Sequence, residues 1–181
     1  MNREAFDHAI RASGAILGEN ELLVIGSQAV HASVSEVPIE AEQSLEADIA
    51  ALDDPHERKA DLIDGSIGEA SMFHTTFGYY VQGVTESTAV LPRGWRNRLV
   101  RYETPGTNGV VAWCLEIHDL WISKAIAFRP KDRELCAALM SGGLVDAGTL
   151  ACRLEAVDGL EAELRSHVSG LIERLHRPLP H

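Results

Sequence analysis

The sequence predicts an α+β fold, in which a β-sheet is flanked by helices and a C-terminal helical region follows. Over the first two thirds of the chain, short apolar runs that end at turn residues alternate with segments of helical periodicity. After residue 118 only helical periodicity continues. Hydrophobic residues make up 45% of the 181 residues, which is enough to bury the core of one domain.

The first elements are expected to be a helix, a strand and a second helix. Arg3 to Leu17 places apolar side chains near helical spacing, which predicts an amphipathic helix. Glu21 to Ile25 is a short apolar run that stops at Gly26, as a buried strand does. Ser27 is then expected to cap a helix that runs through residue 32, because its hydroxyl can accept a free backbone N–H of the first turn.

A second strand is expected shortly afterwards. Residues 36–42 contain Pro38 and predict a loop. From Leu45 to Leu52, apolar residues alternate with Glu46 and Asp48. Because successive side chains of a strand point to opposite faces, this segment is predicted to be a strand with both acids on one face.

The middle of the chain predicts one helix and three strands. Arg58 to Ile67 carries a modest apolar stripe and predicts a helix. Phe73 to Gly83 is interpreted as a strand from its aromatic and β-branched centre. Leu99 to Glu103 and Val110 to Leu115 flank a dense turn signal, so a β-hairpin is expected there.

The C-terminal part is expected to be helical. Its apolar stripes stop before Pro130 and before the Gly142-Gly143 pair, and a last stripe runs from Leu160 to Leu175. We therefore expect an α/β core with an N-terminal helix over residues 1–117, and a helical region over residues 118–181 that packs on it as part of one structural domain. The tail from His176 to His181 is expected to fray.

Charge and composition exclude several classes of function. The formal net charge of −11 repels nucleic acid at long range, so generic DNA or RNA coating is not expected. The chain has no apolar run of about 18 residues and no signal-peptide pattern, so we expect a cytoplasmic protein that makes no membrane contact. Buried free thiols are expected rather than disulfides or a zinc site, because the cysteines are odd in number and widely spaced: Cys114, Cys136 and Cys152.

Half of the 16 Lys and Arg residues lie in two segments. The first segment contains Arg93, Arg96, Arg98 and Arg101, and the second contains Lys124, Arg129, Lys131 and Arg133. They form either two solvated faces that balance nearby acids or the wall of a local binding site, and the sequence leaves both interpretations open.

Two motifs fit the chemistry of nucleotide transfer. Negative charge on a triphosphate must be neutralised by a divalent metal, which acidic side chains hold at fixed spacing. Glu46 and Asp48, at i and i+2 of one strand, are placed to share one Mg²⁺. Gly26 and Ser27 form a turn at the start of a helix, where backbone N–H groups and a hydroxyl can bind phosphate.

The order of these motifs resembles the signature of the nucleotidyltransferase superfamily, whose fold is a mixed sheet of the polymerase-beta-like type. Two later segments resemble its AbiEii-like, toxin-type branch, so that the likeness spans roughly residues 21–140: Asp119-Leu120-Trp121-Ile122-Ser123-Lys124 and Arg129-Pro130-Lys131-Asp132-Arg133.

The resemblance implies specific roles. Glu46 and Asp48 would hold Mg²⁺ or Mn²⁺ and act in catalysis, together with Lys124, which would contact the triphosphate of an NTP donor. The remaining residues implied at the nucleotide are Gly26, Ser27, Lys131 and Asp132.

Two features depart from that family pattern. The family usually has Asp as the first acid, whereas Glu46 stands here and its extra methylene moves the carboxylate outward. A third metal-binding acid often lies on a later strand. Glu103 is the first candidate because it ends a predicted strand, and Glu116 is the second.

The expected function is transfer of a nucleotide from an NTP to an RNA end or a protein hydroxyl, as the toxin-type member of a toxin-antitoxin pair with a cognate partner protein. A non-catalytic module that binds a protein, and an enzyme acting on a small molecule, share the same core and stay open. Each motif alone also has a structural explanation, since Gly-Ser turns and alternating acids are common. Their joint occurrence in this order favours the enzyme.

Overall fold

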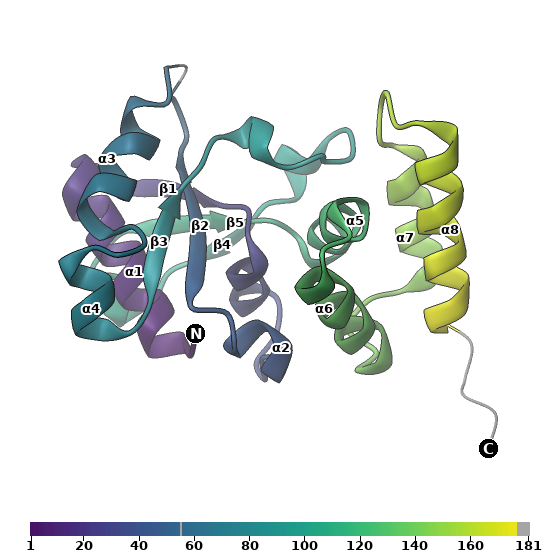
Figure 1. Ribbon diagram of the computed structural model, residues 1–181, viewed down its shortest axis with the longest axis horizontal. Helices are drawn as coiled ribbons and strands as arrows, with labels where there is room; N and C mark the ends of the chain where they lie inside the picture. The colour runs from purple at the N-terminus through teal and green to yellow at the C-terminus, as the bar shows by residue number, and fades with distance from the viewer. Residues whose placement is uncertain (55, 177–181) are drawn as a thin grey trace.

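In the computed structural model, residues 1–54 and 56–176 are described, and Figure 1 labels their elements. The helices are α1 (Arg3–Leu17), α2 (Ile39–Glu42), α3 (Arg58–Ile67), α4 (Met72–Phe77), α5 (Ile117–Ala127), α6 (Pro130–Ser141), α7 (Ala147–Glu155) and α8 (Ala162–His176). The strands are β1 (Glu21–Val24), β2 (Glu46–Ala51), β3 (Tyr80–Gly83), β4 (Val100–Tyr102) and β5 (Val111–Cys114). The 3₁₀ helices are η1 (Ser27–Ala32), η2 (Glu86–Thr88), η3 (Trp95–Arg98) and η4 (Pro105–Thr107). Apart from His176, the tail expected to fray lies outside the described residues.

The strands form one mixed sheet in the order β3-β2-β1-β5-β4. Strand β1 pairs antiparallel with β2 and parallel with β5, β2 pairs parallel with β3, and β4 pairs antiparallel with β5. The ends of β1 and β5 and the starts of β2, β3 and β4 therefore meet at one edge of the sheet, which we call the site edge. The α+β class with a mixed sheet, predicted from the sequence, is confirmed.

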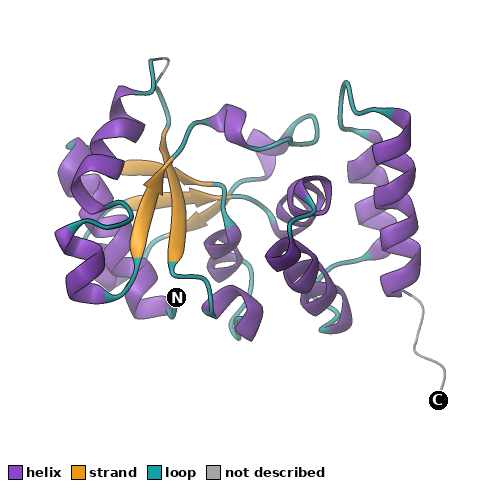
Figure 2. Cartoon of the chain, in the orientation of Figure 1, coloured by secondary structure: helices purple, strands orange, loops and turns teal. Residues whose placement is uncertain are grey.

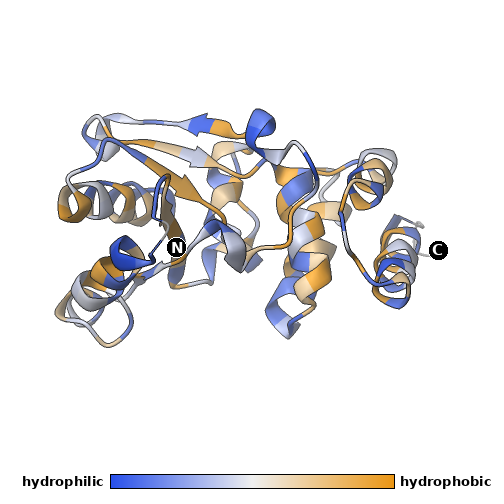
Figure 3. Ribbon diagram, turned by 90° about the horizontal axis from the view of Figure 1, so that it is seen from above, coloured by the Kyte–Doolittle hydropathy of each residue, from blue (hydrophilic) through white to orange (hydrophobic). Residues whose placement is uncertain are grey.

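Helices pack around this sheet and beside its site edge. Helices α1 and α3 pack on each other and on the sheet, while α5 packs on α6, α7 and α8 as a separate helical layer (Figures 1 and 2). Hydrophobic residues mark the strands and stripes of the helices in Figure 3. Their largest fully buried side chains include Phe6, Leu22, Ile49 and Trp121, which come from the sheet and from both groups of helices.

Most expected elements form where the sequence placed them, but the segment from Phe73 to Gly83 was only half right. Its first part is helix α4 and only its end is strand β3. The Ser71 side chain accepts a hydrogen bond from the backbone N–H of His74 and starts the helix. Gly78 ends it with a left-handed φ of 77°. These two caps outweigh the strand composition of the aromatic residues.

The helix after Gly26 also differs from the prediction. Element η1 is a six-residue 3₁₀ helix, and its N-cap is Gly26 without a side-chain hydrogen bond. The Ser27 hydroxyl accepts instead from Nε2 of Gln28 at 3.5 Å. Ser27 is therefore not a helix cap, and so short a helix offers little dipole for binding an anion.

Helices α2 and α7 and the exposure of Cys152 were not predicted from the sequence. Helix α2 lies in a segment expected to be a loop, and helix α7 begins at an unrecognised cap, where the Asp146 side chain accepts from the backbone N–H of Thr149. All three cysteines are free, as expected, but Cys152 is exposed whereas Cys114 and Cys136 are buried. A helix with the length and apolar character needed to cross a bilayer is absent from the part of the chain that the structure describes.

Candidate functional site

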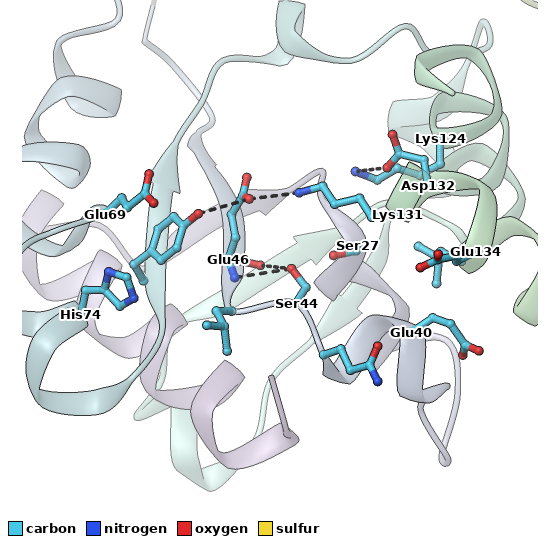
Figure 4. Close-up of a pocket in the computed structure, with 14 residues that line it drawn as sticks. Ser27, Glu40, Ser44, Glu46, Glu69, His74, Lys124, Lys131, Asp132 and Glu134 are labelled. Atoms are coloured by element: carbon cyan, nitrogen blue, oxygen red, sulfur yellow. Dashed lines mark hydrogen bonds and ion pairs between the residues drawn. The ribbon is translucent and has the colours of Figure 1, made fainter. Parts of the chain in front are cut away.

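A cavity of about 370 Å³ opens at the site edge, between the sheet and helix α6 (Figure 4). This volume suits one small molecule. In Figure 4, Lys124 and Lys131 reach in from the C-terminal helices on one side of Glu46, and Glu69 and His74 lie on the other side. The described residues that line the cavity are Ser27, Glu40, Gln43, Ser44, Leu45, Glu46, Glu69, His74, Tyr80, Lys124, Lys131, Asp132, Glu134 and Leu135.

Glu46 and Asp48 lie on the same face of β2, because they are two residues apart in a strand. Both are half-buried, whereas Ala47 and Ile49 are buried. The two carboxyl groups are close enough that each shifts the pKa of the other. Asp48 also lies against Gly26, so that a Cβ at residue 26 would overlap the Asp48 carboxylate. The backbone φ of Gly26 is −88°, which any residue adopts, and glycine is needed here only for space. Of the two acids, Glu46 forms part of the cavity lining described above, and Asp48 lies beside it on the Gly26 side.

The two carboxyl groups differ in how firmly they hold a proton. Burial raises the pKa of Asp48 to about 7, and the neighbouring carboxylate of Glu46 acts in the same direction. Burial also opposes ionisation of Glu46, but its interaction with Asp48 and the charges of Lys131 and Lys124 outweigh burial and lower its pKa. In the absence of a cation, Asp48 therefore holds its proton more firmly than Glu46 does.

The two lysines of the cavity are held differently. Nζ of Lys131 lies 3.2 Å from Oε2 of Glu46, and the Lys131 side chain is 56% exposed. Nζ of Lys124 lies 3.6 Å from Oδ1 of Asp132, and the Lys124 side chain is 13% exposed. Asp132 is itself buried and accepts from the backbone N–H of Arg129 at the start of α6. Lys124 is therefore fixed in the wall, whereas Lys131 reaches across the cavity.

Tyr80 is a site residue that the sequence analysis missed. Its hydroxyl donates to Oε2 of Glu46 at 3.4 Å, because Tyr80 and Glu46 are register partners in the parallel pair of β3 and β2. Burial and the charge of Glu46 raise the pKa of Tyr80 to about 12, so the phenol stays protonated and remains a donor. The residues Tyr79, Tyr80 and Val81 did predict a strand. One sequence could not show that this strand pairs with β2 and so places Tyr80 beside Glu46.

Neither candidate for the third acid joins the pair. Glu103 follows β4, which runs antiparallel to β5 and ends at the edge opposite the site edge, where Glu103 pairs with Arg101. Glu116 is the N-cap of α5, and its Oε1 lies 2.6 Å from Nδ1 of His118. Within residues 1–54 and 56–176, no group of three or more His, Cys, Asp or Glu side chains is arranged to hold a metal.

The first basic segment is balanced by acids and takes no part in the cavity lining described above. Each of its arginines pairs with a carboxylate, in the pairs Arg93–Asp158, Arg96–Glu86, Arg98–Asp119 and Arg101–Glu103. The second segment supplies Lys124 and Lys131 to the cavity, whereas Arg133 stacks over the ring of Phe128.

Asp119, which belongs to the motif that suggested the family, has a structural position. It is fully buried and accepts from Nε and Nη2 of Arg98 at 2.8 and 3.0 Å, and Nε of Arg153 lies 3.1 Å away. The three side chains join η3, α5 and α7. A buried carboxylate with two guanidinium partners holds these elements together.

The donor set at the site edge fits a hard divalent cation. Mg²⁺ takes oxygen ligands and is commonly held by one or two carboxylates, with water and substrate phosphates completing its shell. Glu46 and Asp48 supply two adjacent carboxylates, and Lys124 and Lys131 supply positive charge in the same cavity. A third protein acid is therefore not needed for such a site.

Comparison with known proteins gives one match. The model of a protein family described as "Nucleotidyltransferase of unknown function (DUF6036)" matches residues 6–164. No curated protein matches the chain, and no solved structure does.

Proposed function

Since the chain belongs to the nucleotidyltransferase family whose model covers residues 6–164, we propose that its cavity binds an NTP with Mg²⁺ or Mn²⁺. The acceptor hydroxyl loses its proton and bonds to the α-phosphorus, the bond between the α- and β-phosphates breaks, and pyrophosphate leaves. Glu46 and Asp48 hold the metal. Lys124 and Lys131 neutralise the triphosphate. Gly26 and Ser27, at the same edge of the sheet, lie beside the phosphates.

One observation carries this proposal. Two acids lie on one face of β2 at the site edge, and two lysines from different helices lie in the cavity that Glu46 lines. When two acids are adjacent, the pKa of one is raised, and ionising both is costly without a cation. Acids and lysines in this arrangement match a ligand that carries both a divalent cation and phosphates.

The residues contribute mainly by position and charge. When bound, Mg²⁺ would neutralise charge on the triphosphate. Lys124 is a rigid phosphate ligand, because Asp132 fixes its ammonium in the wall. Asp132 carries negative charge and would repel phosphate, so we assign it the role of positioning Lys124 rather than touching the nucleotide. Fixed charges of this kind stabilise charge that develops during phosphoryl transfer.

Three acids that line the cavity bear on the choice of acceptor. Glu40, Glu69 and Glu134 line the cavity, and in the described part of the chain no basic group lies within ion-pair distance of them. These carboxylates repel an RNA backbone and tolerate a protein segment. Of the two acceptors expected from the sequence, we therefore favour a protein hydroxyl. A toxin-type role with a cognate partner protein fits this choice, and the segments around Lys124 and Lys131 support it by their resemblance to the AbiEii-like branch.

A second candidate function is a non-catalytic module that binds a protein partner. The placement of Glu103 at the opposite edge favours it, because the acid pair then lacks the third carboxylate common in the superfamily. The two candidates differ in one property. The proposed catalytic site binds an NTP only together with a divalent cation. An interaction module either binds no NTP or binds it equally well without the metal.

Calorimetric titration of the purified protein with each common NTP, in Mg²⁺ and in chelator, separates the two. The proposal predicts binding in Mg²⁺ that weakens at least about tenfold in chelator, a difference of about 1.4 kcal/mol. Glu103→Gln should bind like the unmodified protein, because this acid lies at the other edge. Binding that ignores the metal, or no binding of any NTP, would leave the interaction module as the better account.

A further inference from the structure

We propose that Lys131 couples metal binding to nucleotide binding by exchanging partners. In this structure its ammonium is bonded to Glu46, a carboxylate that holds the metal in the proposed function. When an NTP enters, Lys131 turns to the phosphates and leaves Glu46 free for the cation. The inference rests on the proposed function, and it adds that the acid pair binds metal poorly until a nucleotide removes this lysine.

Lys131 and a bound cation would compete for one oxygen of Glu46. Oε2 of Glu46 accepts from Nζ of Lys131 at 3.2 Å and from the Tyr80 hydroxyl at 3.4 Å. A carboxylate oxygen has about two lone-pair sites, so these two donors fill it. A divalent cation that binds through Oε2 must displace one of them. It also meets the positive charge of Lys131 at the same oxygen, whereas the neutral phenol adds no charge repulsion.

Lys131 is free to move, whereas Lys124 is held in the cavity wall. The Lys131 side chain is 56% exposed, and Glu46 is its ion-pair partner within the described residues. Lys124 is 13% exposed and bonded to Asp132, which is 3% exposed. A long, exposed side chain with one ion pair exchanges partners at little cost. Lys131 is therefore the lysine that can move between the acid pair and a phosphate.

The ion pair between Lys131 and Glu46 links helix α6 to the sheet. Glu46 belongs to strand β2 and Lys131 to helix α6, and 85 residues of sequence separate them. Their ion pair spans the cavity, as the dashed line in Figure 4 shows. A phosphate group that enters here lies between an ammonium it attracts and a carboxylate it repels. The nucleotide therefore separates Lys131 from Glu46, and this separation frees Glu46 to bind the metal.

If Lys131 exchanges partners, its removal should change the affinity for the cation and the affinity for the NTP in opposite directions. Without Lys131, the cation alone should bind more tightly, because nothing positive occupies Glu46. The NTP should bind more weakly, because one phosphate ligand is missing. A lysine that contacts only phosphate would leave the affinity for the cation alone unchanged. Binding free energies are reciprocal, so the factor by which NTP improves cation binding must also fall.

The test is titration with Mn²⁺ in the absence of nucleotide, followed by electron paramagnetic resonance of free Mn²⁺. Lys131→Met should bind Mn²⁺ about two- to tenfold more tightly than the unmodified protein, as expected for release of a partly exposed ion pair. Lys131→Arg retains the charge and should resemble the unmodified protein. Lys59→Met removes an equal charge at a distant ion pair with Glu19, and should change nothing.

Two further measurements complete the test. Tyr80→Phe removes the neutral donor from the same oxygen and should not tighten Mn²⁺ binding as Lys131→Met does. In a separate titration, Lys131→Met should bind NTP more weakly. If the unmodified protein and Lys131→Met bind Mn²⁺ with equal affinity, the exchange is wrong while the proposed function stands. If none of the proteins binds Mn²⁺ or NTP, the proposed function fails together with this inference.

Discussion

The carboxylate of Asp48 lies in the space that a side chain at Gly26 would occupy. This contact joins the two motifs that the sequence placed 22 residues apart, since β1 leads into Gly26 and β2 carries Asp48. The Gly-Ser turn therefore matters for the room it leaves beside the acid pair. The Ser27 side chain does not serve as a helix cap.

Gly26→Ala tests this contact. The added methyl group must displace the Asp48 carboxylate, so we expect a loss of about 1 to 3 kcal/mol in unfolding free energy and weaker Mn²⁺ binding. Urea unfolding and Mn²⁺ titration measure the two effects. Gly65→Ala is the matched control, because a Cβ at Gly65 meets nothing within 4 Å and the residue lies inside helix α3. The control should be neutral or more stable by up to about 1 kcal/mol, and equal stability of the two variants would refute the steric contact.

Asp48→Asn should change how stability depends on pH in the absence of metal. The folded pKa of Asp48 is raised to about 7 from its ordinary 3.8, so between these values the folded state holds a proton that the unfolded state has lost. Stability from this group is fully present below the lower value and is lost as pH rises through the higher one. The Asn side chain does not titrate.

In chelator, the stability of Asp48→Asn relative to the unmodified protein should therefore rise from pH 4 to pH 8. Titrating groups that do not interact with Asp48 cancel in this difference. Urea unfolding at both pH values gives the result, and the variant should be at least as stable as the unmodified protein at pH 8. A relative stability that stays constant, or that falls toward pH 8, would show that Asp48 is an ordinary ionised acid accepting structural hydrogen bonds.

Lys124→Met should weaken NTP binding by about tenfold or more, since a hydrogen bond to a charged group contributes about 1.5 to 3 kcal/mol. It should also lower the unfolding free energy by about 1 kcal/mol, because the buried carboxylate of Asp132 loses a partner. Calorimetric titration with NTP and Mg²⁺ measures the first effect, with Lys59→Met as the charge control. NTP affinity equal to that of the control would make Lys124 a structural partner of Asp132 alone.

Asp119→Asn should lower the stability of the fold without changing its affinity for Mn²⁺. Arg98 and Arg153 would lose their buried anionic partner, which we expect to lower the unfolding free energy by about 3 kcal/mol. Mn²⁺ affinity of the folded variant should not change, because Asp119 belongs to the contact between η3, α5 and α7. A folded variant with normal stability and impaired Mn²⁺ binding would contradict this division of roles.

Local patterns in the sequence predicted much of the fold. Helix α1 begins and ends at Arg3 and Leu17 as its periodicity indicated, because Asn2 and Gly18 cap it. The alternation around Glu46 and Asp48 correctly predicted a strand with both acids on one face, since period-two burial depends only on neighbouring residues. Where a cap was overlooked, as at Ser71, a helix was mistaken for a strand.

Relations between distant segments could not be predicted in the same way. Glu103 was chosen because it ends a strand, but the edge it reaches depends on the direction of β4, which a single sequence does not indicate. Tyr80 and Lys131 reach Glu46 from 34 and 85 residues away, through strand pairing and helix packing. Such pairings are set by the tertiary structure, so a single sequence predicts that Glu46 and Asp48 share a face but not which groups contact Glu46.

Glu46 and Asp48 are proposed to form a site for a divalent cation, and Mn²⁺ binding followed by electron paramagnetic resonance shows whether they do. Titrations in the presence of a non-hydrolysable NTP should show a bound Mn²⁺ in the unmodified protein and in Glu103→Gln, which changes an acid at the opposite edge of the sheet. Asp48→Asn should bind Mn²⁺ at least about tenfold more weakly, because one of two charged ligands is gone. Equal Mn²⁺ affinity of Asp48→Asn and Glu103→Gln would contradict the claim.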